Sequence, residues 1–302
     1  MKTTLSLFFI LLFLNSFSQE RFLEKNTNFS ESTYTYQRIK KDKNLKLDFY
    51  KPKKRKGKVP LLIYVHGGGF SGGDRKDKAA TDFAKEMVQY GYAVASISYR
   101  LTMKGIGFGC TTSSVLKIAA FNDVSKDISY AVKYFLKRKN KFKIDTDKII
   151  LVGSSAGAEA VLNLAYVYEN KILDTNFKFA GIIAMAGATI SIDKITTETA
   201  IPTQLFHGIQ DDLVPYNIAS HHYCKKDATG YLPLFGSKAI AEKLKLIKKP
   251  FYLYSVKNGD HSWNARPIYQ CKNEIIDFLY YDVLKHQNRQ VETAIYNKKS
   301  ET

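Results

Sequence analysis

Beyond its first residues, the sequence has no apolar run long enough to cross a membrane. It also has no internal repeat, no linker rich in proline, glycine or serine, and no low-complexity tract. These absences exclude a repeat array and an integral membrane span, and they leave no visible boundary between domains. With 45% hydrophobic residues, the chain can bury one large core, so the composition also excludes a disordered protein.

Acidic residues are scarce relative to basic ones. Lys and Arg total 46 against 28 Asp and Glu, a formal net charge of +18. Such an excess can indicate a nucleic-acid, anionic-glycan or membrane-surface partner. The lysines are scattered, however, and only residues 51–58 form a basic cluster, in an expected turn between two strands. Because no recognition motif accompanies the charge, we expect no nucleic-acid partner.

Cysteine is also rare, with one residue each at positions 110, 224 and 271. None has the spacing of zinc ligands, and the adjacent His221 and His222 are more typical of a polar loop, so we expect no metal site. In an oxidising compartment three cysteines would leave one disulfide and one free thiol. Cys110 and Cys224 both lie in expected loops and could pair, but the sequence leaves the pairing open.

The first 18 residues have the features of a cleaved signal peptide. Lys2 supplies the positive charge, residues 5–14 form a short apolar run, and residues 16–18 make a small-residue cleavage site. The cleavage site contains no cysteine, so we expect no lipid attachment there. The sequence therefore predicts export, to the periplasm or the cell exterior, after cleavage near Ser18.

Strands alternate with helices through the rest of the chain, residues 19–302. Apolar runs predict buried strands at 59–65, 92–99, 148–152, 179–185, 202–206 and 251–256. Helical spacing predicts helices at 76–90, 123–139, 158–168, 236–247 and 271–286. An antiparallel pair, 33–40 and 44–50, precedes them. This order predicts one α/β domain with a mostly parallel twisted sheet and helices on both faces.

Three connections, at about 101–121, 188–201 and 216–235, are longer than ordinary loops. Each follows the carboxyl end of a strand, which is the edge where open α/β sheets bind ligands. We expect these segments to form pocket walls or a partial lid.

A candidate nucleophile lies in residues 153–157, Gly-Ser-Ser-Ala-Gly, between a strand and a helix. Glycines at both ends allow a sharp turn that would project Ser155 above the sheet edge. The helix N-terminus would direct the positive end of its dipole at the same point. Glycine and serine clusters are also common as plain turns, so this motif alone is weak and needs partner residues.

Residues 66–69, His-Gly-Gly-Gly, follow the strand 59–65 and offer backbone donors. The amides of Gly68 and Gly69, with that of Ala156 after the serine, would hold the oxyanion of a tetrahedral intermediate. A tight glycine turn is the plainer interpretation, and a phosphate loop is disfavoured because the Lys-Ser/Thr pair is missing.

The acid and the base follow two later strands. Asp211 and Asp212 come after the strand 202–206, and both are candidates for orienting an imidazole. His261 comes after the strand 251–256 and is the best candidate base. We expect structural roles for His66 and His207, which lie inside glycine motifs. The order serine, acid, histidine is the order that α/β-hydrolases use.

Residues 66–70, the serine turn, the Asp211 motif and His261 together resemble an α/β-hydrolase esterase of the His-Gly-Gly-Gly type. This group includes hormone-sensitive-lipase-like and bacterial feruloyl-esterase-like carboxylesterases. The family's Asp-x-x-Val-Pro spacing favours Asp211 over Asp212. Ala158 departs from the second glycine that relatives often have, and the long loops are not standard.

The resemblance implies a secreted serine carboxylesterase that works through a Ser155–His261–Asp211 triad and an acyl-enzyme, without a metal or organic cofactor. Small-molecule or carbohydrate-linked esters would be its substrates, for example acetyl or feruloyl esters on polysaccharide. An acyl or aromatic pocket could be lined by Phe70, Tyr99, Phe108, Tyr216 and Trp263, which are equally common as core or loop residues.

Two other functions stay open at this point. The same fold supports serine peptidases and amidases, although the glycine loop and the lack of a propeller-like repeat domain disfavour them. A non-catalytic binding protein is the third alternative. The oligomeric state, the acyl group and the alcohol cannot be read from the sequence.

Overall fold

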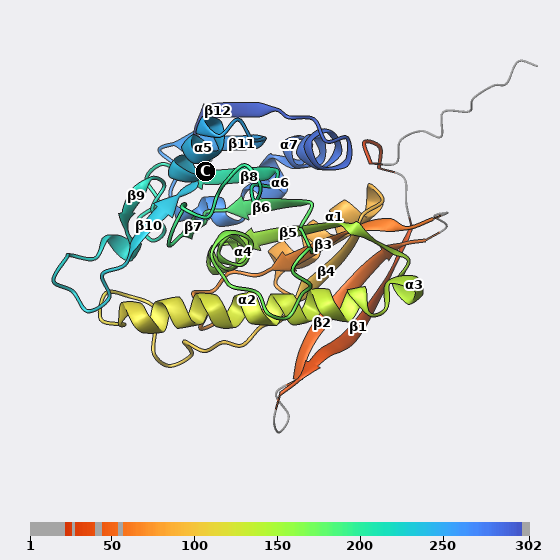
Figure 1. Cartoon of the computed structure of the whole chain (residues 1–302), viewed down its shortest axis with the longest axis horizontal. Helices are drawn as coiled ribbons and strands as arrows, with labels where there is room; N and C mark the ends of the chain where they lie inside the picture. The colour runs from red at the N-terminus through yellow and green to blue at the C-terminus, as the bar shows by residue number, and fades with distance from the viewer. Residues whose placement is uncertain (1–21, 26–27, 40–43, 54–56, 298–302) are drawn as a thin grey trace, which may run out of the picture.

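The computed structural model describes residues 22–25, 28–39, 44–53 and 57–297 (Figure 1). The expected signal peptide, residues 1–18, lies outside these ranges, as does part of the basic cluster 51–58. None of the helices within the described ranges combines the length and apolarity that a membrane crossing needs.

A nine-stranded sheet runs through the molecule in the order β1-β2-β4-β3-β5-β6-β8-β11-β12. The strands are β1 (Phe29–Arg38), β2 (Asn44–Pro52), β3 (Val59–Val65), β4 (Ala93–Ile97), β5 (Ile144–Ser154), β6 (Gly181–Met185), β8 (Thr203–Gly208), β11 (Phe251–Lys257) and β12 (Gln290–Tyr296). β1 and β2 are antiparallel to each other, and β2 is antiparallel to β4. From β4 to β12 all pairings are parallel. The predicted mostly parallel α/β sheet is confirmed.

Helices cover both faces of the sheet (Figure 1). They are α1 (Lys78–Gln89), α2 (Ser114–Leu136), α3 (Lys139–Phe142), α4 (Ala156–Tyr166), α5 (Ser237–Leu246), α6 (Pro267–Gln270) and α7 (Lys272–Asp277). Residues of α2, α4 and α5 join one hydrophobic cluster, and residues of α1, α6 and α7 join the other.

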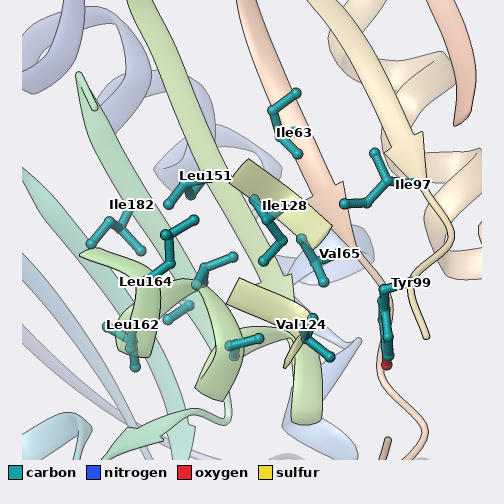
Figure 2. Packing of buried hydrophobic residues seen from close by; sticks show 14 of the residues in the cluster. Ile63, Val65, Ile97, Tyr99, Val124, Ile128, Leu151, Leu162, Leu164 and Ile182 are labelled. Atoms are coloured by element: carbon teal, nitrogen blue, oxygen red, sulfur yellow. The ribbon is translucent and has the colours of Figure 1, made fainter. Parts of the chain in front are cut away.

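The central strand β3 explains why its sequence is apolar throughout. Ile63 and Val65 face the cluster under α2 and α4, where Val124, Ile128 and Leu162 also lie (Figure 2). Leu62 and Tyr64, the alternate residues, face the cluster under α1. A strand buried on both faces needs an unbroken apolar run rather than alternation.

Several predicted boundaries were wrong. The helix expected at 123–139 begins at Ser114, because the Ser113 side chain accepts a hydrogen bond from the Leu116 amide and caps it. The connection expected at 101–121 therefore ends at residue 113, just before the helix begins. The helix expected at 271–286 divides into α7 and a π-helical segment, Phe278–Leu284. Strand β12, at the sheet edge, was not anticipated.

The other two long connections contain short strands that were also missed. β7 (Ala188–Thr189) lies in the segment 188–201, and β9 (Ile218–Ser220) and β10 (Pro233–Gly236) lie in 216–235. They form a small antiparallel sheet in the order β7-β10-β9. Such short strands contain too few residues to show a periodicity. Their pairing also joins residues that are about 45 positions apart in the sequence, in β7 and β10. The pairing ties the two segments together at one edge of the molecule.

Candidate active site

The turn between β5 and α4 holds Ser155 in a strained backbone conformation. Its φ is 50° and its ψ is −121°, in a region that L-residues rarely adopt. The Ser155 amide donates to the Met185 carbonyl oxygen at 2.9 Å, which fastens the turn to β6. The strain is held by this bond and by the packing of the strand against the helix.

The flanking glycines are required by close backbone contacts. A Cβ at Gly153 would lie 2.4 Å from the Gly157 carbonyl oxygen, and a Cβ at Gly157 would lie 2.1 Å from the Val65 carbonyl oxygen. Neither neighbour is a flexible side chain, so neither can move aside. Both glycines of the motif are therefore needed to bring helix α4 against β3 and β5.

Ala158, the departure from the family pattern, is accommodated by another glycine. A Cβ at Gly187, just after β6, would lie 2.7 Å from the Ala158 Cβ. The space for the alanine methyl group exists because residue 187 has no side chain. This pair could not be recognised from the sequence, because the two residues meet only in the folded chain.

The structure brings together the three residues expected to form a triad. The Ser155 Oγ lies 2.8 Å from the His261 Nε2, and the His261 Nδ1 lies 2.8 Å from the Asp211 Oδ2. The other carboxylate oxygen of Asp211 accepts hydrogen bonds from the Leu213 and Val214 amides, both at 2.9 Å. Asp211 is 1% exposed, whereas Asp212 points to solvent. The geometry thus places Asp211, not Asp212, against the imidazole.

Two tight backbone approaches set the position of His261, which begins a short 3₁₀ turn (His261–Asn264) after β11. A Cβ at Gly208, the last residue of β8, would lie 2.4 Å from the carbonyl oxygens of Gly259 and Asp260. The Gln210 amide also donates to the Gly259 carbonyl oxygen at 2.8 Å. The loops that carry the acid and the base are therefore held directly against each other.

His207 supports the acid from the opposite side, in agreement with the structural role expected for it. It is fully buried, and its Nε2 lies 3.3 Å from the Asp211 Oδ2 and 3.0 Å from the Val214 carbonyl oxygen. Its Nδ1 lies 2.8 Å from the Ser237 Oγ. One carboxylate oxygen of Asp211 thus faces two imidazoles.

Electrostatics favours an ionised acid beside a basic imidazole. Burial raises the pKa of Asp211, but the hydrogen bonds to His207 and His261 outweigh burial and lower that pKa overall. Burial lowers the pKa of His261, but the hydrogen bond to Asp211 and its charge outweigh burial and raise that pKa overall. His261 is therefore a stronger base than a free imidazole.

Gly68, Gly69 and Ala156, the expected oxyanion donors, line the same cavity as Ser155 and His261. Gly68 has a φ of 114° and Gly69 has a φ of 57°. A Cβ at Gly68 would lie 2.3 Å from the Gly72 carbonyl oxygen, so this turn excludes other residues. Ala156 is the first residue of α4, and amides in the first turn of a helix have no partner within the helix.

His66 holds the glycine loop from behind. Its ring stacks on the Tyr99 ring at a centroid distance of 4.2 Å, and the Tyr99 hydroxyl donates to the His66 carbonyl oxygen at 3.0 Å. Its Nδ1 lies 2.7 Å from the Gly67 carbonyl oxygen. Burial lowers the pKa of His66, which favours a neutral ring and fits the structural role expected for it.

The cavity next to Ser155 has a volume of about 440 Å³, within the range of small-molecule sites. Apolar parts of its wall come from α1, from Phe108 and from the segment after Asp211. The lining residues are Tyr64, His66, Gly67, Gly68, Gly69, Gly73, Asp77, Ala79, Ala80, Phe108, Ser154, Ser155, Ala156, Glu159, Leu213, Val214, His221, His222, His261, Asn264 and Ala265.

Of the aromatic residues suggested for the pocket, Phe108 lines the cavity and the other four do not. Phe70 is fully buried between Tyr99, Phe108 and Phe121, so it packs behind the wall. Tyr99 stacks behind His66, as described above. These two residues support the pocket rather than face it.

The prediction that Tyr216 and Trp263 line the pocket was also wrong, because both side chains pack behind its wall. The Tyr216 hydroxyl lies 2.6 Å from the Ser255 Oγ, and its ring packs edge-on against His207. Trp263 is buried and stacks on Tyr254. Large aromatic side chains beside a site gain more by packing under its loops than by lining the opening.

Sequence reasoning missed several polar residues on the cavity wall, among them Glu159, His221 and His222. For Glu159 a signal was available, because it follows Ser155 by one helical turn and so lies on the same face of α4. For the histidines none was, since their position depends on a loop contact between distant segments. Burial, followed by the charges of His221 and Lys117, lowers the pKa of His222 to about 4.

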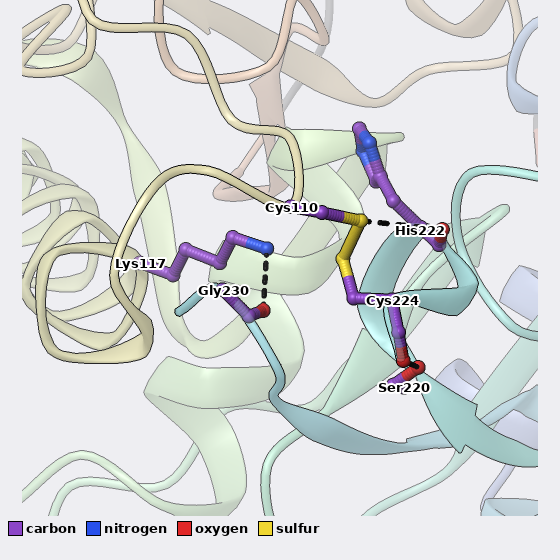
Figure 3. Close-up of a disulfide and its surroundings, with 6 residues drawn as sticks. All are labelled: Cys110, Lys117, Ser220, His222, Cys224 and Gly230. Atoms are coloured by element: carbon purple, nitrogen blue, oxygen red, sulfur yellow. Dashed lines mark hydrogen bonds between the residues drawn. A yellow bond between two sulfur atoms is a disulfide. The ribbon is translucent and has the colours of Figure 1, made fainter. Parts of the chain in front are cut away.

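The open cysteine pairing is resolved by a disulfide between Cys110 and Cys224, which joins two of the long segments (Figure 3). Beside it, the Lys117 Nζ donates to the Gly230 carbonyl oxygen at 2.9 Å. The Gly230 amide donates to the Cys110 carbonyl oxygen at 2.8 Å. We call residues 107–112 and 221–230 the roof, because they carry Phe108, His221 and His222 over the cavity. Cys271 remains a free, buried thiol.

Comparisons with known proteins find esterases among the similar sequences and structures. Residues 47–192 match the BD-FAE family model, which covers Gly68, Gly69 and Ser155 but not the acid or the histidine. Gut esterase 1 of Caenorhabditis briggsae is 29% identical over 143 residues, covering 45% of this chain and 25% of that protein. Endo-1,4-beta-xylanase B of Butyrivibrio fibrisolvens is 24% identical over 178 residues, covering 54% and 28%. The chain spans only about a quarter of the length of these curated relatives.

Among solved structures, esterase 2 of Thermogutta terrifontis with bound propionate has a similar fold. Its TM-score is 0.60 at 17% sequence identity, and the match covers 83% of this chain and 94% of that one. At this identity the match supports the fold alone, while the family model and the curated relatives carry the esterase relationship. The chain therefore has an α/β-hydrolase fold and is similar in sequence to esterases over part of its length.

Proposed function

We propose that this protein is a serine carboxylesterase with Ser155 as nucleophile, His261 as general base and Asp211 as the orienting acid. The observation that carries the proposal is the hydrogen-bonded series from the Ser155 Oγ through the imidazole to the buried carboxylate, with both distances at 2.8 Å. A hydroxyl is a weak nucleophile by itself, so it needs a base held in this way.

In the proposed reaction, the His261 Nε2 takes the Ser155 proton as the Oγ attacks the ester carbonyl carbon. The amides of Gly68, Gly69 and Ala156 would stabilise the oxyanion, each donor being worth about 3 kcal/mol of transition-state stabilisation in comparable enzymes. The imidazolium then protonates the leaving alcohol. Water, activated by the same imidazole, releases the acid from the acyl-enzyme.

The substrates we propose are small or carbohydrate-linked esters, including acetyl or feruloyl esters on polysaccharide. The cavity size supports a compact group beside Ser155, and one relative is named as a xylanase. We also propose that the protein is exported after removal of residues 1–18. The Cys110–Cys224 disulfide supports export, because disulfides persist mainly in oxidising compartments.

The test is hydrolysis of p-nitrophenyl esters of increasing acyl length, with and without Ser155→Ala. We expect hydrolysis that is fastest for short chains and that falls to background in Ser155→Ala. Ser30→Ala, on the exposed side of β1, is the matched control and should behave like the wild-type protein. Full activity in Ser155→Ala would contradict the proposed nucleophile.

Two further results would replace the proposal. Turnover of aminoacyl p-nitroanilides without turnover of esters would indicate a peptidase or amidase. No turnover in either panel, together with tight binding of a glycan, would indicate a non-catalytic binding protein.

A further inference from the structure

Glu159 is a buried carboxylate on the wall of the candidate active site. It lies one turn beyond Ser155 on α4, and its amide donates to the Ser155 carbonyl oxygen at 3.0 Å. Its side chain is 2% exposed, yet it borders the same cavity as Ser155 and His261. Helical geometry places side chains four residues apart on one face, so the carboxylate lies beside the nucleophile.

The Glu159 Oε1 has no hydrogen-bond partner within the described part of the chain. The His221 Nε2 in the roof lies 3.3 Å from this oxygen. The His221 Nδ1 also has no partner among the described residues, although His221 is 1% exposed. Buried polar atoms are almost always paired, because an unpaired one loses its hydration without compensation.

The surrounding charges leave the carboxylate incompletely neutralised. Lys117 is a buried cation near Glu159. Its Nζ, however, donates to the Gly230 carbonyl oxygen and lies over the Phe108 ring at 5.6 Å. Burial lowers the pKa of Lys117 overall, and the Glu159 charge only opposes that lowering. For His261, burial lowers the pKa, and the hydrogen bond and charge of Asp211, followed by the Glu159 charge, raise it overall. Among the described residues no group of three or more His, Cys, Asp or Glu side chains could hold a metal ion.

We propose that Glu159 and His221 form a subsite that binds a hydrogen-bond-donating group of the ester substrate, an O–H or a protonated N–H close to the scissile bond. This inference rests on the proposed esterase function. An ionised carboxylate can only accept hydrogen bonds, so it selects a donor on the ligand. Phe108 and Leu213 add apolar surface to the wall, and plain alkyl groups would leave the carboxylate unpaired.

The competing interpretation is that Glu159 and His221 only fasten the roof to α4. The two interpretations differ in what they predict for substrates. A fastening contact affects every ester equally, because it acts on the shape of the whole pocket. A recognition contact affects only esters that carry the donor, because the others never form the bond.

The experiment uses two pairs of acetate esters with the complete protein. One pair is a methyl β-xyloside monoacetate with free hydroxyls and the same ester with those hydroxyls methylated. The other is 2-(dimethylamino)ethyl acetate, protonated at neutral pH, and its neutral isostere 3-methylbutyl acetate. We expect kcat/KM to favour the donor-bearing member of one pair by about ten- to a hundredfold, as for hydrogen bonds to charged groups.

Two substitutions identify the carboxylate as the cause. Glu159→Leu should bring the ratio within the preferred pair close to one. Glu159→Gln keeps an acceptor without the charge, so it should retain part of a preference for hydroxyls but lose a preference for the ammonium ester. Glu169→Gln is the matched control, since Glu169 is exposed and pairs with Lys194 on the surface, and it should leave the ratio unchanged. Thermal unfolding of each variant checks that it is folded.

The outcomes separate the two levels of the proposal. Wild-type protein that hydrolyses p-nitrophenyl acetate but shows no preference in either pair would overturn this subsite and leave the esterase proposal standing. Equal losses for both members of a pair in Glu159→Leu would also overturn it in favour of the fastening role. Absence of any esterase activity would overturn both proposals. The preference itself is measured on wild-type protein, so the test does not depend on whether a variant folds.

Discussion

Replacement of Asp211 by asparagine tests the electrostatic reasoning most directly. The carboxylate holds His261 through a 2.8 Å hydrogen bond to its Nδ1, which leaves the Nε2 free to take the serine proton. Asparagine is nearly isosteric, but its amide can donate to the Nδ1 and so favour the tautomer that carries the proton on the Nε2. We expect kcat/KM to fall by about 10⁴-fold, the loss typical of this substitution in serine triads. That loss corresponds to about 5.4 kcal/mol of transition-state stabilisation.

The same substitution should move the pH profile. The neutral, unprotonated imidazole is the base, so the rate rises as the pH passes through the pKa of His261. In the wild-type protein the hydrogen bond and charge of Asp211 raise this pKa above its ordinary value of about 6.5. In Asp211→Asn that contribution is lost and the lowering caused by burial remains. The acid limb of kcat/KM for p-nitrophenyl acetate should therefore shift to lower pH.

Asp212→Asn is the matched control, because Asp212 is the exposed neighbour. It should retain nearly full activity, with a small shift of the acid limb at most. The reasoning would be refuted if Asp211→Asn kept its activity within tenfold of the wild type, or if its residual activity showed an unshifted acid limb.

The remaining predictions concern the fold and the roof. Gly157→Ala places a methyl group 2.1 Å from the Val65 carbonyl oxygen. We therefore expect a loss of at least about 3 kcal/mol in the free energy of unfolding by urea, or failure to fold. Gly109→Ala, where a Cβ would meet nothing within 4 Å, should change this free energy little. Cys110→Ser combined with Cys224→Ser opens a bridge that spans 114 residues, which should cost about 2–5 kcal/mol in urea unfolding and raise KM as the roof loosens; an unchanged KM would show that the other roof contacts suffice. Leu151→Ala removes a fully buried side chain in the core under α4, so it should lower the free energy of unfolding by about 2–5 kcal/mol while leaving KM for p-nitrophenyl acetate unchanged in the folded protein (Figure 2).

Local chemistry explains which parts of the fold could be predicted. Strand 59–65 was placed at its observed bounds because a strand buried on both faces is apolar at every position. The start of α2 was missed by nine residues, since it is set by the Ser113 cap and its first turns pack under the roof. The edge strand β12 alternates in exposure, and its weak pattern was overlooked because it pairs on one side only.

The candidate site divides in the same way. Ser155, Asp211 and His261 could be expected to meet because each follows a strand in an order tied to the backbone of the fold, and the structure brings the three side chains together. The pocket wall was not, because residues such as Glu159 and His221 meet across 62 positions of sequence. Phe70 and Trp263 are of residue types that are common in pockets, but they lie behind the wall, where their burial stabilises the fold more.

The sequence by itself determined the alternation of strands and helices, the sharp glycine turn at residues 153–157 and the candidate serine, acid and histidine. These features depend on local sterics and on contacts between neighbouring elements. Only the tertiary structure decided that Gly187 makes room for Ala158 and that His221 lies 3.3 Å from Glu159. Each of those depends on side chains from distant segments packing at close range, and local patterns contain no information on such contacts.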